Sequence, residues 1–476
     1  MFHVYDRHCA FVISFGGMRG LITLTLLAVL PCLGQHESHT APKDQEQKMP
    51  PGHQHMPDMN APMNTEQHAM DAAEIHQASG TGVNPRSAPM EMIHKRAGDW
   101  TLMFHGIGFL ADIQQTGPRG RDKLVAPNWF MGTAEHTLSG GTVEFRSMIS
   151  LDPATITKRR YPLLFQTGET AYGKPVVDGQ HPHDFLMELS AQYSHPIAES
   201  TSLLLYFAPV GDPALGPVAF PHRVSAMEIP QATLAHHLQD STHIANEVFT
   251  AGLLRHMFRI EASGFHGAEP NENRWNIDYG TIDSWSARLT LTPGANWTAQ
   301  ASLGRLAHPE AAEPGDIVRA TASVTYNRPL AAGNWATSLV WGRNHKTAEQ
   351  RNLNSFLAES VLRFRHKNYV TGRVELVDKD ELLNDRPEIR QHLDATIGSV
   401  FRITAYTAGY TRDIGLVSWL ETGLGANFTF YAIPSAIQPY YGSHPVGFVV
   451  FLRARLKGGE HTMQNMPNMQ HMHHGS

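Results

Sequence analysis

Two segments of this 476-residue chain concentrate thioether and imidazole side chains. The first is MPPGHQHMPDMNAPM at 49–63, and the second is HTMQNMPNMQHMHHGS at 461–476. Thioether sulfur is a soft ligand that selects Cu(I), whereas imidazole also suits Cu(II), zinc and nickel, so mixed clusters spaced by one to three residues favour copper. Silver has a similar preference and stays an alternative. The candidate ligands in and beside these segments are His53, His55, Met56, Met59, Met63, His68, Met70, Met463, Met466, Met469, His471, Met472, His473 and His474.

A second group of histidines lies in two long polar connections, near 178–184 and 210–243. Such connections are too polar to face lipid, where unsatisfied backbone groups are costly, so we expect them to fold into a barrel lumen or to lie outside the membrane. A carboxylate beside an imidazole can accept the second ring N–H and fix the tautomer that binds metal. The alternative is that these histidines anchor a plug through hydrogen bonds. The candidate ligands are His181, His183, His222, His236, His237, His243, Asp178, Asp184 and Asp240, with His266, Glu269 and Glu272 as weaker additions.

The elements that position these residues are short segments in which polar and apolar residues alternate. Trp285, Ala287 and Leu289, for example, alternate with Ser286 and Arg288. This is the period of a strand with two different faces, and many segments have the roughly ten residues that a tilted strand needs to cross a bilayer. The segments lie near 100–113, 127–138, 141–151, 184–194, 201–209, 244–255, 257–266, 281–292, 295–306, 316–327, 333–344, 354–365, 368–379, 392–412, 415–429 and 446–456. The sequence therefore predicts an all-β transmembrane antiparallel β-barrel of about 16 strands, with a range of 14–18.

Aromatic residues near the segment ends agree with a membrane barrel, whose interfacial girdles contain tryptophan and tyrosine. A soluble β-sandwich would alternate in the same way, but sixteen strands exceed what one sandwich uses. The aromatic residues expected in the girdles are Trp129, Trp275, Tyr279, Trp335, Tyr431, Tyr440 and Tyr441.

Composition and targeting signals complete the domain prediction. Charged residues make up 17% of the chain and the net charge is −6, which does not suggest nucleic-acid binding. The apolar run 21–33 follows Arg19 and has the length of a secretory signal segment, so we expect cleavage after Gly34 and translation from Met1 or Met18. The predicted domains are a signal peptide (1–34), a disordered Met/His-rich segment (35–98), an outer-membrane barrel (99–456) and a Met/His-rich tail (457–476).

An enzyme is not expected from this sequence. Asp240-Ser241-Thr242-His243 contains the residue types of a hydrolase, but catalytic partners are brought together by folding rather than by adjacency. The chain has neither a G-x-S-x-G elbow nor an H-E-x-x-H motif.

In organisation, the chain resembles the outer-membrane copper-resistance B proteins. The resemblance consists of an exported precursor, a Met/His-rich N-terminal segment and then a β-barrel. It implies a protein of the Gram-negative outer membrane that transports or sequesters copper, with lipid, metal ions and periplasmic copper-handling proteins as partners. Three features have no counterpart in that pattern: the HPHD segment at 181–184, the HHLQDSTH segment at 236–243 and the second Met/His-rich tail. A general porin with incidental metal-binding tails, or a metal-storage barrel without a pore, are the alternatives.

Overall fold

The computed structural model describes residues 78–89, 91–241, 245–311, 315–396 and 398–458. The predicted signal peptide lies outside these residues. So do His243 and all the candidate ligands of the two Met/His-rich segments.

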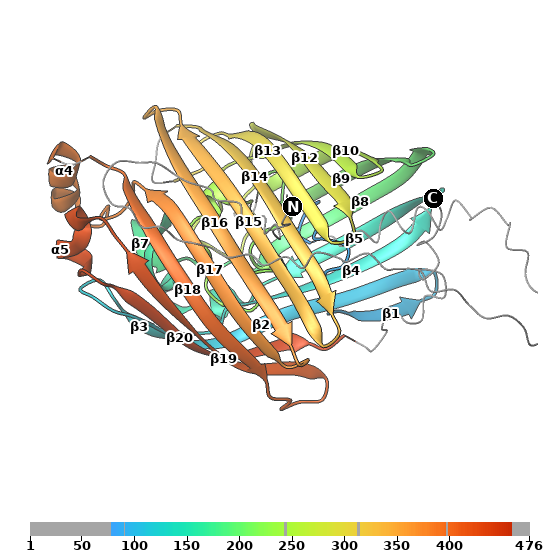
Figure 1. The fold of residues 1–476 in the computed structure, drawn as a ribbon. Coiled ribbons are helices and arrows are strands. Elements are labelled where there is room, and N and C mark those ends of the chain that lie inside the picture. The colour runs from blue at the N-terminus through green and yellow to red at the C-terminus, as the bar shows by residue number, and fades with distance from the viewer. Residues whose placement is uncertain (1–77, 90, 242–244, 312–314, 397, 459–476) are drawn as a thin grey trace, which may run out of the picture. The chain divides into compact units, whose positions relative to one another are not determined.

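Sixteen antiparallel strands close into one barrel (Figure 1), so the predicted fold class and strand number are confirmed. The first and last wall strands, β2 (Trp100–Gln115) and β20 (Val446–Leu456), pair from Ile107↔Arg455 to Gln115↔Gly447 and complete the ring. The other wall strands, each paired with its neighbour along the chain, are β4 (Asn128–Leu138), β5 (Gly141–Ile149), β8 (Leu186–Ala198), β9 (Thr201–Gly211), β10 (Ala245–Arg255), β11 (Phe258–His266), β12 (Ser284–Gly294), β13 (Trp297–Leu306), β14 (Ile317–Leu330), β15 (Gly333–Lys346), β16 (Arg351–Phe364), β17 (Asn368–Lys379), β18 (Phe401–Asp413) and β19 (Leu420–Ala432).

The two faces of the wall differ as the alternation predicts. On β12, Ser286 and Arg288 are buried in the interior, whereas Trp285 and Leu289 face outward. An apolar exterior around a polar interior is the arrangement of an outer-membrane barrel. The architecture therefore agrees with the predicted outer-membrane location.

One predicted strand begins in the wrong place. Residues 387–396 form the helix α4 (Pro387–Thr396), and strand β18 begins only at Phe401. The helix buries Arg390 and Leu393, three residues apart, on one face. This spacing is the helical period, which the prediction of a strand from 392 overlooked.

The two ends of the barrel carry different connections. Short turns join the strands at one end, for example Ser139–Gly140 between β4 and β5, and this is also the end at which β2 begins and β20 ends. Short turns face the periplasm in outer-membrane barrels. The long connections at the other end contain β3 (Asp122–Val125), α2 (Asp152–Thr155), η1 (Thr157–Arg159), β6 (Tyr161–Ala171), β7 (Lys174–Gln180), α3 (His236–Gln239), α4, η2 (Ser435–Ile437) and α5 (Gln438–Tyr441), while β1 (Ile93–Ala97) precedes the barrel and pairs with β2.

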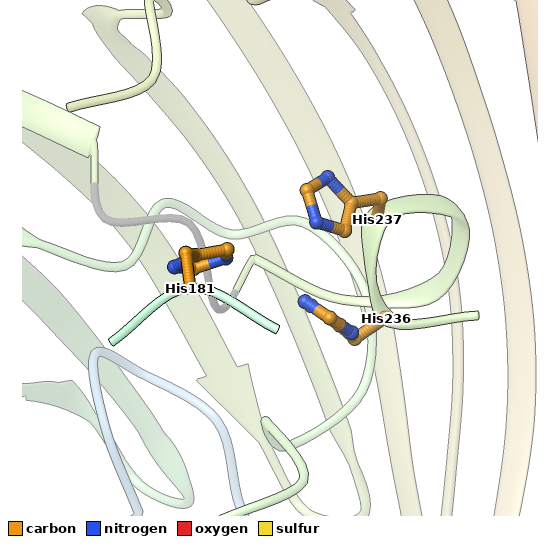
Figure 2. A group of neighbouring side chains, drawn as sticks. All are labelled: His181, His236 and His237. Carbon is orange, nitrogen blue, oxygen red and sulfur yellow. The ribbon is translucent and has the colours of Figure 1, made fainter. Parts of the chain in front are cut away.

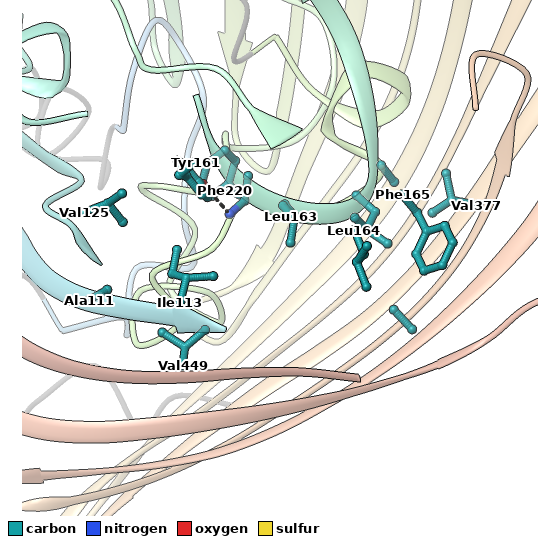
Figure 3. Packing of buried hydrophobic residues seen from close by; sticks show 14 of the residues in the cluster. Ala111, Ile113, Val125, Tyr161, Leu163, Leu164, Phe165, Phe220, Val377 and Val449 are labelled. Carbon is teal, nitrogen blue, oxygen red and sulfur yellow. Dashed lines mark hydrogen bonds between the residues drawn. The ribbon is translucent and has the colours of Figure 1, made fainter. Parts of the chain in front are cut away.

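The interior holds a hydrophobic cluster at the end with the long connections (Figure 3). The β6–β7 hairpin contributes Leu163, Leu164 and Phe165, which are buried together with the wall residues Ile113 and Val449. This hairpin therefore packs inside the barrel instead of extending away from it. Within the described part of the chain, no helix is both long and apolar enough to cross a membrane.

Three of the aromatic residues predicted for the girdles point inward instead. Trp129, Tyr431 and Tyr441 are buried, whereas Trp275, Tyr279 and Trp335 are exposed. Trp129 shares the inward face of β4 with Met131, two residues away, because side chains of a strand alternate between faces. Position near a strand end thus does not decide which face an aromatic residue occupies.

Candidate functional site in the barrel lumen

Residues 212–241, the described part of the connection from β9 to β10, lie inside the barrel. All of them are buried except Pro221 and Met227, which are half-buried. We call this segment the plug. The sequence left open whether the long connections fill the lumen, and the structure shows that this one does.

Buried ion pairs join the plug to the wall. Arg223 pairs with Glu359 of β16 at 2.5 Å, and Glu228 pairs with Arg453 and, at 3.2 Å, with Arg455 of β20. Removing one partner of such a pair leaves an uncompensated buried charge and costs about 3–5 kcal/mol. Wall side chains also donate to plug carbonyls, from Arg373 to Gln231 (3.2 Å), from Arg319 to Asp240 (2.9 Å) and from Asn344 to His237 (3.1 Å). The plug is therefore held in one position by many polar contacts.

A second segment, residues 78–89, runs along the plug. Its Gly80 carbonyl accepts a hydrogen bond from Arg146 of β5 at 2.8 Å, and Asn84 donates to the carbonyl of His222 in the plug at 3.0 Å. Most of its residues are buried. The predicted boundary at 98 between a disordered segment and the barrel is therefore too late, because residues 78–89 already belong to the lumen.

Three of the predicted histidines converge, two from the plug and one from the connection after β7 (Figure 2). His181 follows β7, and His236 and His237 begin α3; one nitrogen from each lies within 4.8 Å of the others. Their ring centroids are 4.4 Å apart for His236 and His237, and 6.2 and 6.0 Å from His181 to these two. All three side chains are buried. The structure thus brings the HPHD and HHLQDSTH segments to one place.

Each of the three imidazoles has a partner that orients the ring. His236 Nδ1 lies 2.6 Å from the carbonyl of Thr233, and His181 Nδ1 lies 3.0 Å from that of Pro182. A ring N–H that donates to a carbonyl fixes the tautomer and leaves Nε2 as the acceptor or metal ligand. His237 Nδ1 faces carboxylates instead, at 3.4 Å from Glu269 and 3.5 Å from Glu310.

The nearby carboxylates give the three histidines different protonation states. Burial lowers the pKa of an imidazole, but Glu269 and Glu310 outweigh it and raise the pKa of His237 to about 9. Burial, followed by the charge of His237, lowers the pKa of His181 to about 3 and that of His236 well below its ordinary value. Burial and the charge of Glu310 raise the pKa of Glu269 to about 7. At neutral pH two imidazoles are therefore neutral and the third is protonated beside carboxylates.

The other predicted ligands lie in different contacts. His183 Nδ1 is 2.8 Å from Asp152, and His222 Nε2 is 3.0 Å from the sulfur of Met148. The three predicted aspartates lie near arginines instead of orienting the clustered histidines: Asp178 pairs with Arg119, Asp184 lies 3.6 Å from Arg274, and Asp240 lies 3.8 Å from Arg223.

Carboxylates that the sequence did not single out lie beside the clustered histidines. His181 Nε2 lies 3.1 Å from Glu169 of β6, and Glu310 follows β13 in a short HPE stretch. Glu310 lies on a different connection from all three histidines, and Glu169 is separated from His181 by the β6–β7 hairpin, so no spacing typical of a metal-binding motif marks either residue. Glu269 was among the weaker candidates, while His266 is bonded to the carbonyl of Thr281 and Glu272 pairs with Arg159.

Three buried imidazoles that converge are the donor set of a borderline divalent metal, zinc or Cu(II), which would displace the proton of His237 as it binds. Nitrogen ligands of one tetrahedral ion at ~2.0 Å lie roughly 3.3 Å apart, so the observed separations require only a modest contraction. The neighbouring carboxylates would then orient the ring of His237.

Comparisons with known proteins give structural likeness alone. No family model and no curated protein sequence matches this chain. The barrel is similar to the anion-selective porin from Comamonas acidovorans (13% identity, 75% of this chain and 100% of that chain, TM-score 0.45) and to OprB of Pseudomonas putida (11%, 75% and 94%, 0.47). It is also similar to the outer membrane channel DcaP of Acinetobacter baumannii (8%, 75% and 99%, 0.45). At these values the function has to be inferred from the chain's own geometry.

Proposed function

We propose that this protein is an outer-membrane channel whose lumen is closed at rest by the plug. The observation that supports this most directly is a closed barrel with a charged inner wall, whose lumen is filled by a segment that buried ion pairs hold in place. A polar interior is typical of barrels that conduct water and solutes, and in some barrels a loop fills it. Displacement of the plug would open a path between the two ends.

Conductance of the full chain in planar bilayers tests the proposal. A variant in which residues 214–240 are replaced by a short Gly/Ser linker should show larger and more frequent conductance steps than the wild type. A variant with the exposed β18–β19 turn, residues 415–418, replaced in the same way serves as the control. If the barrel folds without the plug but still conducts nothing, the channel proposal is wrong and a non-conducting metal-binding barrel is favoured.

A second candidate function is copper handling, which the resemblance to the copper-resistance B proteins also implies. The specific support is the buried group of His181, His236 and His237 in the lumen, together with the Met/His-rich segments of the sequence. Imidazoles take Cu(II) and thioethers take Cu(I), so the chain offers ligands for both oxidation states.

Replacing the methionines of 49–70 and 463–472 with leucine tests the part of this candidate that concerns the tails. We expect the full chain to bind fewer Cu(I) ions after this change, whereas replacing the histidines of the same segments with glutamine mainly lowers Cu(II) uptake. A deletion strain should show altered copper sensitivity. Unchanged Cu(I) stoichiometry together with normal copper tolerance would contradict the candidate.

A further inference from the structure

A second cluster of soft ligands lies in the lumen, away from the three histidines described above. It consists of His105, Met131, Met148 and His222, with Trp129 beside them; we call it the His/Met cluster. His105 Nε2 lies 3.0 Å from the sulfur of Met131, and His222 Nε2 lies 3.0 Å from the sulfur of Met148. The two imidazole ring centroids are 6.2 Å apart.

Strand register brings three of these residues into one row. His105 of β2 is the direct partner of Met131 of β4, and Met131 is the direct partner of Met148 of β5. Directly opposed residues on neighbouring strands have Cβ atoms ~5 Å apart and point to the same side of the sheet. His222 approaches the row from the plug and completes the cluster. Three wall strands and the plug thus meet at one point.

The contacts within the cluster are weak as hydrogen bonds. A thioether is a poor hydrogen-bond acceptor, yet each of the two imidazoles directs a ring nitrogen at a methionine sulfur. Nitrogen and sulfur atoms that share one metal ion, at ~2.0 and ~2.3 Å, lie roughly 3.0–3.7 Å from each other. Imidazoles that share an ion have centroids roughly 5–6 Å apart by the same distances. The observed geometry is close to these values.

From these observations we propose that the His/Met cluster binds one soft monovalent metal ion, Cu(I) or Ag(I). Two thioethers select a soft ion over zinc or a hard cation. All four ligands are neutral when they coordinate, and the cost of burying a charge rises with its square, which favours a monovalent ion over a divalent one. Met131, Met148 and His222 are buried, whereas His105 is partly exposed and provides the side from which an ion enters.

Trp129 gives the site a spectroscopic signal. Its ring centroid lies 4.1 Å from that of His222 and 5.1 Å from that of His105. A cation within ~6 Å of an indole face interacts with the ring, and a bound heavy ion close to the ring quenches its fluorescence. The proposal deepens the copper-handling candidate but does not depend on the tails or on conductance.

Titration of the purified full chain with Ag(I) tests the proposal. The double variant Met131→Leu/Met148→Leu keeps the side-chain volume and removes both sulfurs. We expect it to bind one Ag(I) fewer per chain than the wild type and to lose the quenching step that Trp129→Leu also removes. The matched control Met227→Leu/Met257→Leu removes two thioethers that lie outside the row and should keep both the quenching step and this binding event.

Further variants distinguish metal binding at this site from metal binding by the tails and by the three-histidine group. Replacing the tail methionines should remove other Ag(I) ions but leave the Trp129 quenching step. His181→Gln/His236→Gln should lower Zn(II) binding and leave the same step. If Met131→Leu/Met148→Leu folds, as shown by heat-modifiable migration of the barrel in SDS gels, and keeps both the wild-type Ag(I) stoichiometry and the quenching step, the proposed site is overturned. That outcome would leave copper binding by the tails unaffected.

Discussion

Replacing Glu359 with glutamine should release the plug from the wall. Glu359 is buried on β16 between two buried guanidinium groups, with Arg223 of the plug at 2.5 Å and Arg373 of β17 at 3.0 Å, and it also accepts a hydrogen bond from Ser225 of the plug at 2.9 Å. Glutamine keeps the size of the side chain but removes the charge that compensates both arginines.

The structure sets the size of the expected effect. Breaking a buried pair from one side costs about 3–5 kcal/mol. Arg373 stays on the wall in both states, so only the part of this cost borne by Arg223 favours release of the plug. If that part is about 3 kcal/mol, the ratio of open to closed plug rises roughly 150-fold, since 1.36 kcal/mol corresponds to a factor of ten.

Two measurements on the same preparation check this prediction. Open probability in planar bilayers should rise, and limited proteolysis should cut within 212–241 faster than in the wild type. The control is Glu349→Gln, which removes a half-exposed ion pair with Arg351 at 3.3 Å and should change either measurement by less than about threefold. A folded Glu359→Gln barrel with wild-type conductance and wild-type resistance to protease would refute the view that buried ion pairs hold the plug.

Three further predictions concern single positions in the lumen. Gly168→Ala should destabilise the three-histidine group and weaken Zn(II) binding, because a Cβ at this glycine (φ +112°) would lie 2.4 Å from Cε1 of His237; a Gly173→Ala chain, where the Cβ has free space, is the control. His236→Gln should lower Zn(II) affinity at least tenfold in a competition titration with the full chain, and unchanged affinity would exclude this residue as a ligand. Burial raises the pKa of Asp212 to about 7, so the folded state holds this proton more tightly than the unfolded state. The resulting contribution to the free energy of unfolding is present at low pH and is lost, at about 1.4 kcal/mol per pH unit, as pH rises from about 4 to about 7. Urea unfolding followed by tryptophan fluorescence should show this fall in the wild type but a smaller one in Asp212→Asn; equal pH profiles would contradict the assignment.

Much of the wall could be predicted from sequence because its signal is local. Alternation with a period of two is a property of each strand alone, and residues such as Arg288 and Leu289 show it without reference to any neighbour. One pairing of the His/Met row, that of Met131 with Met148, could be predicted from local sequence in the same way. The two-residue turn Ser139–Gly140, with both residues at positive φ, sets the pairing of Met131 with Met148.

The tertiary structure decided the rest, because it depends on contacts between distant segments. The pairing of His105 with Met131 crosses a long connection, and the approach of His222 requires the plug to fold inward. The carboxylates beside His237 come from two further connections, so no spacing along the chain relates them. Sequence alone therefore determined which residues share a face along each strand, whereas closure of the barrel around the plug determined which residues of the inner face meet. The physical reason is that a strand's two faces follow from its own backbone geometry, while register and loop position follow from packing of the whole barrel.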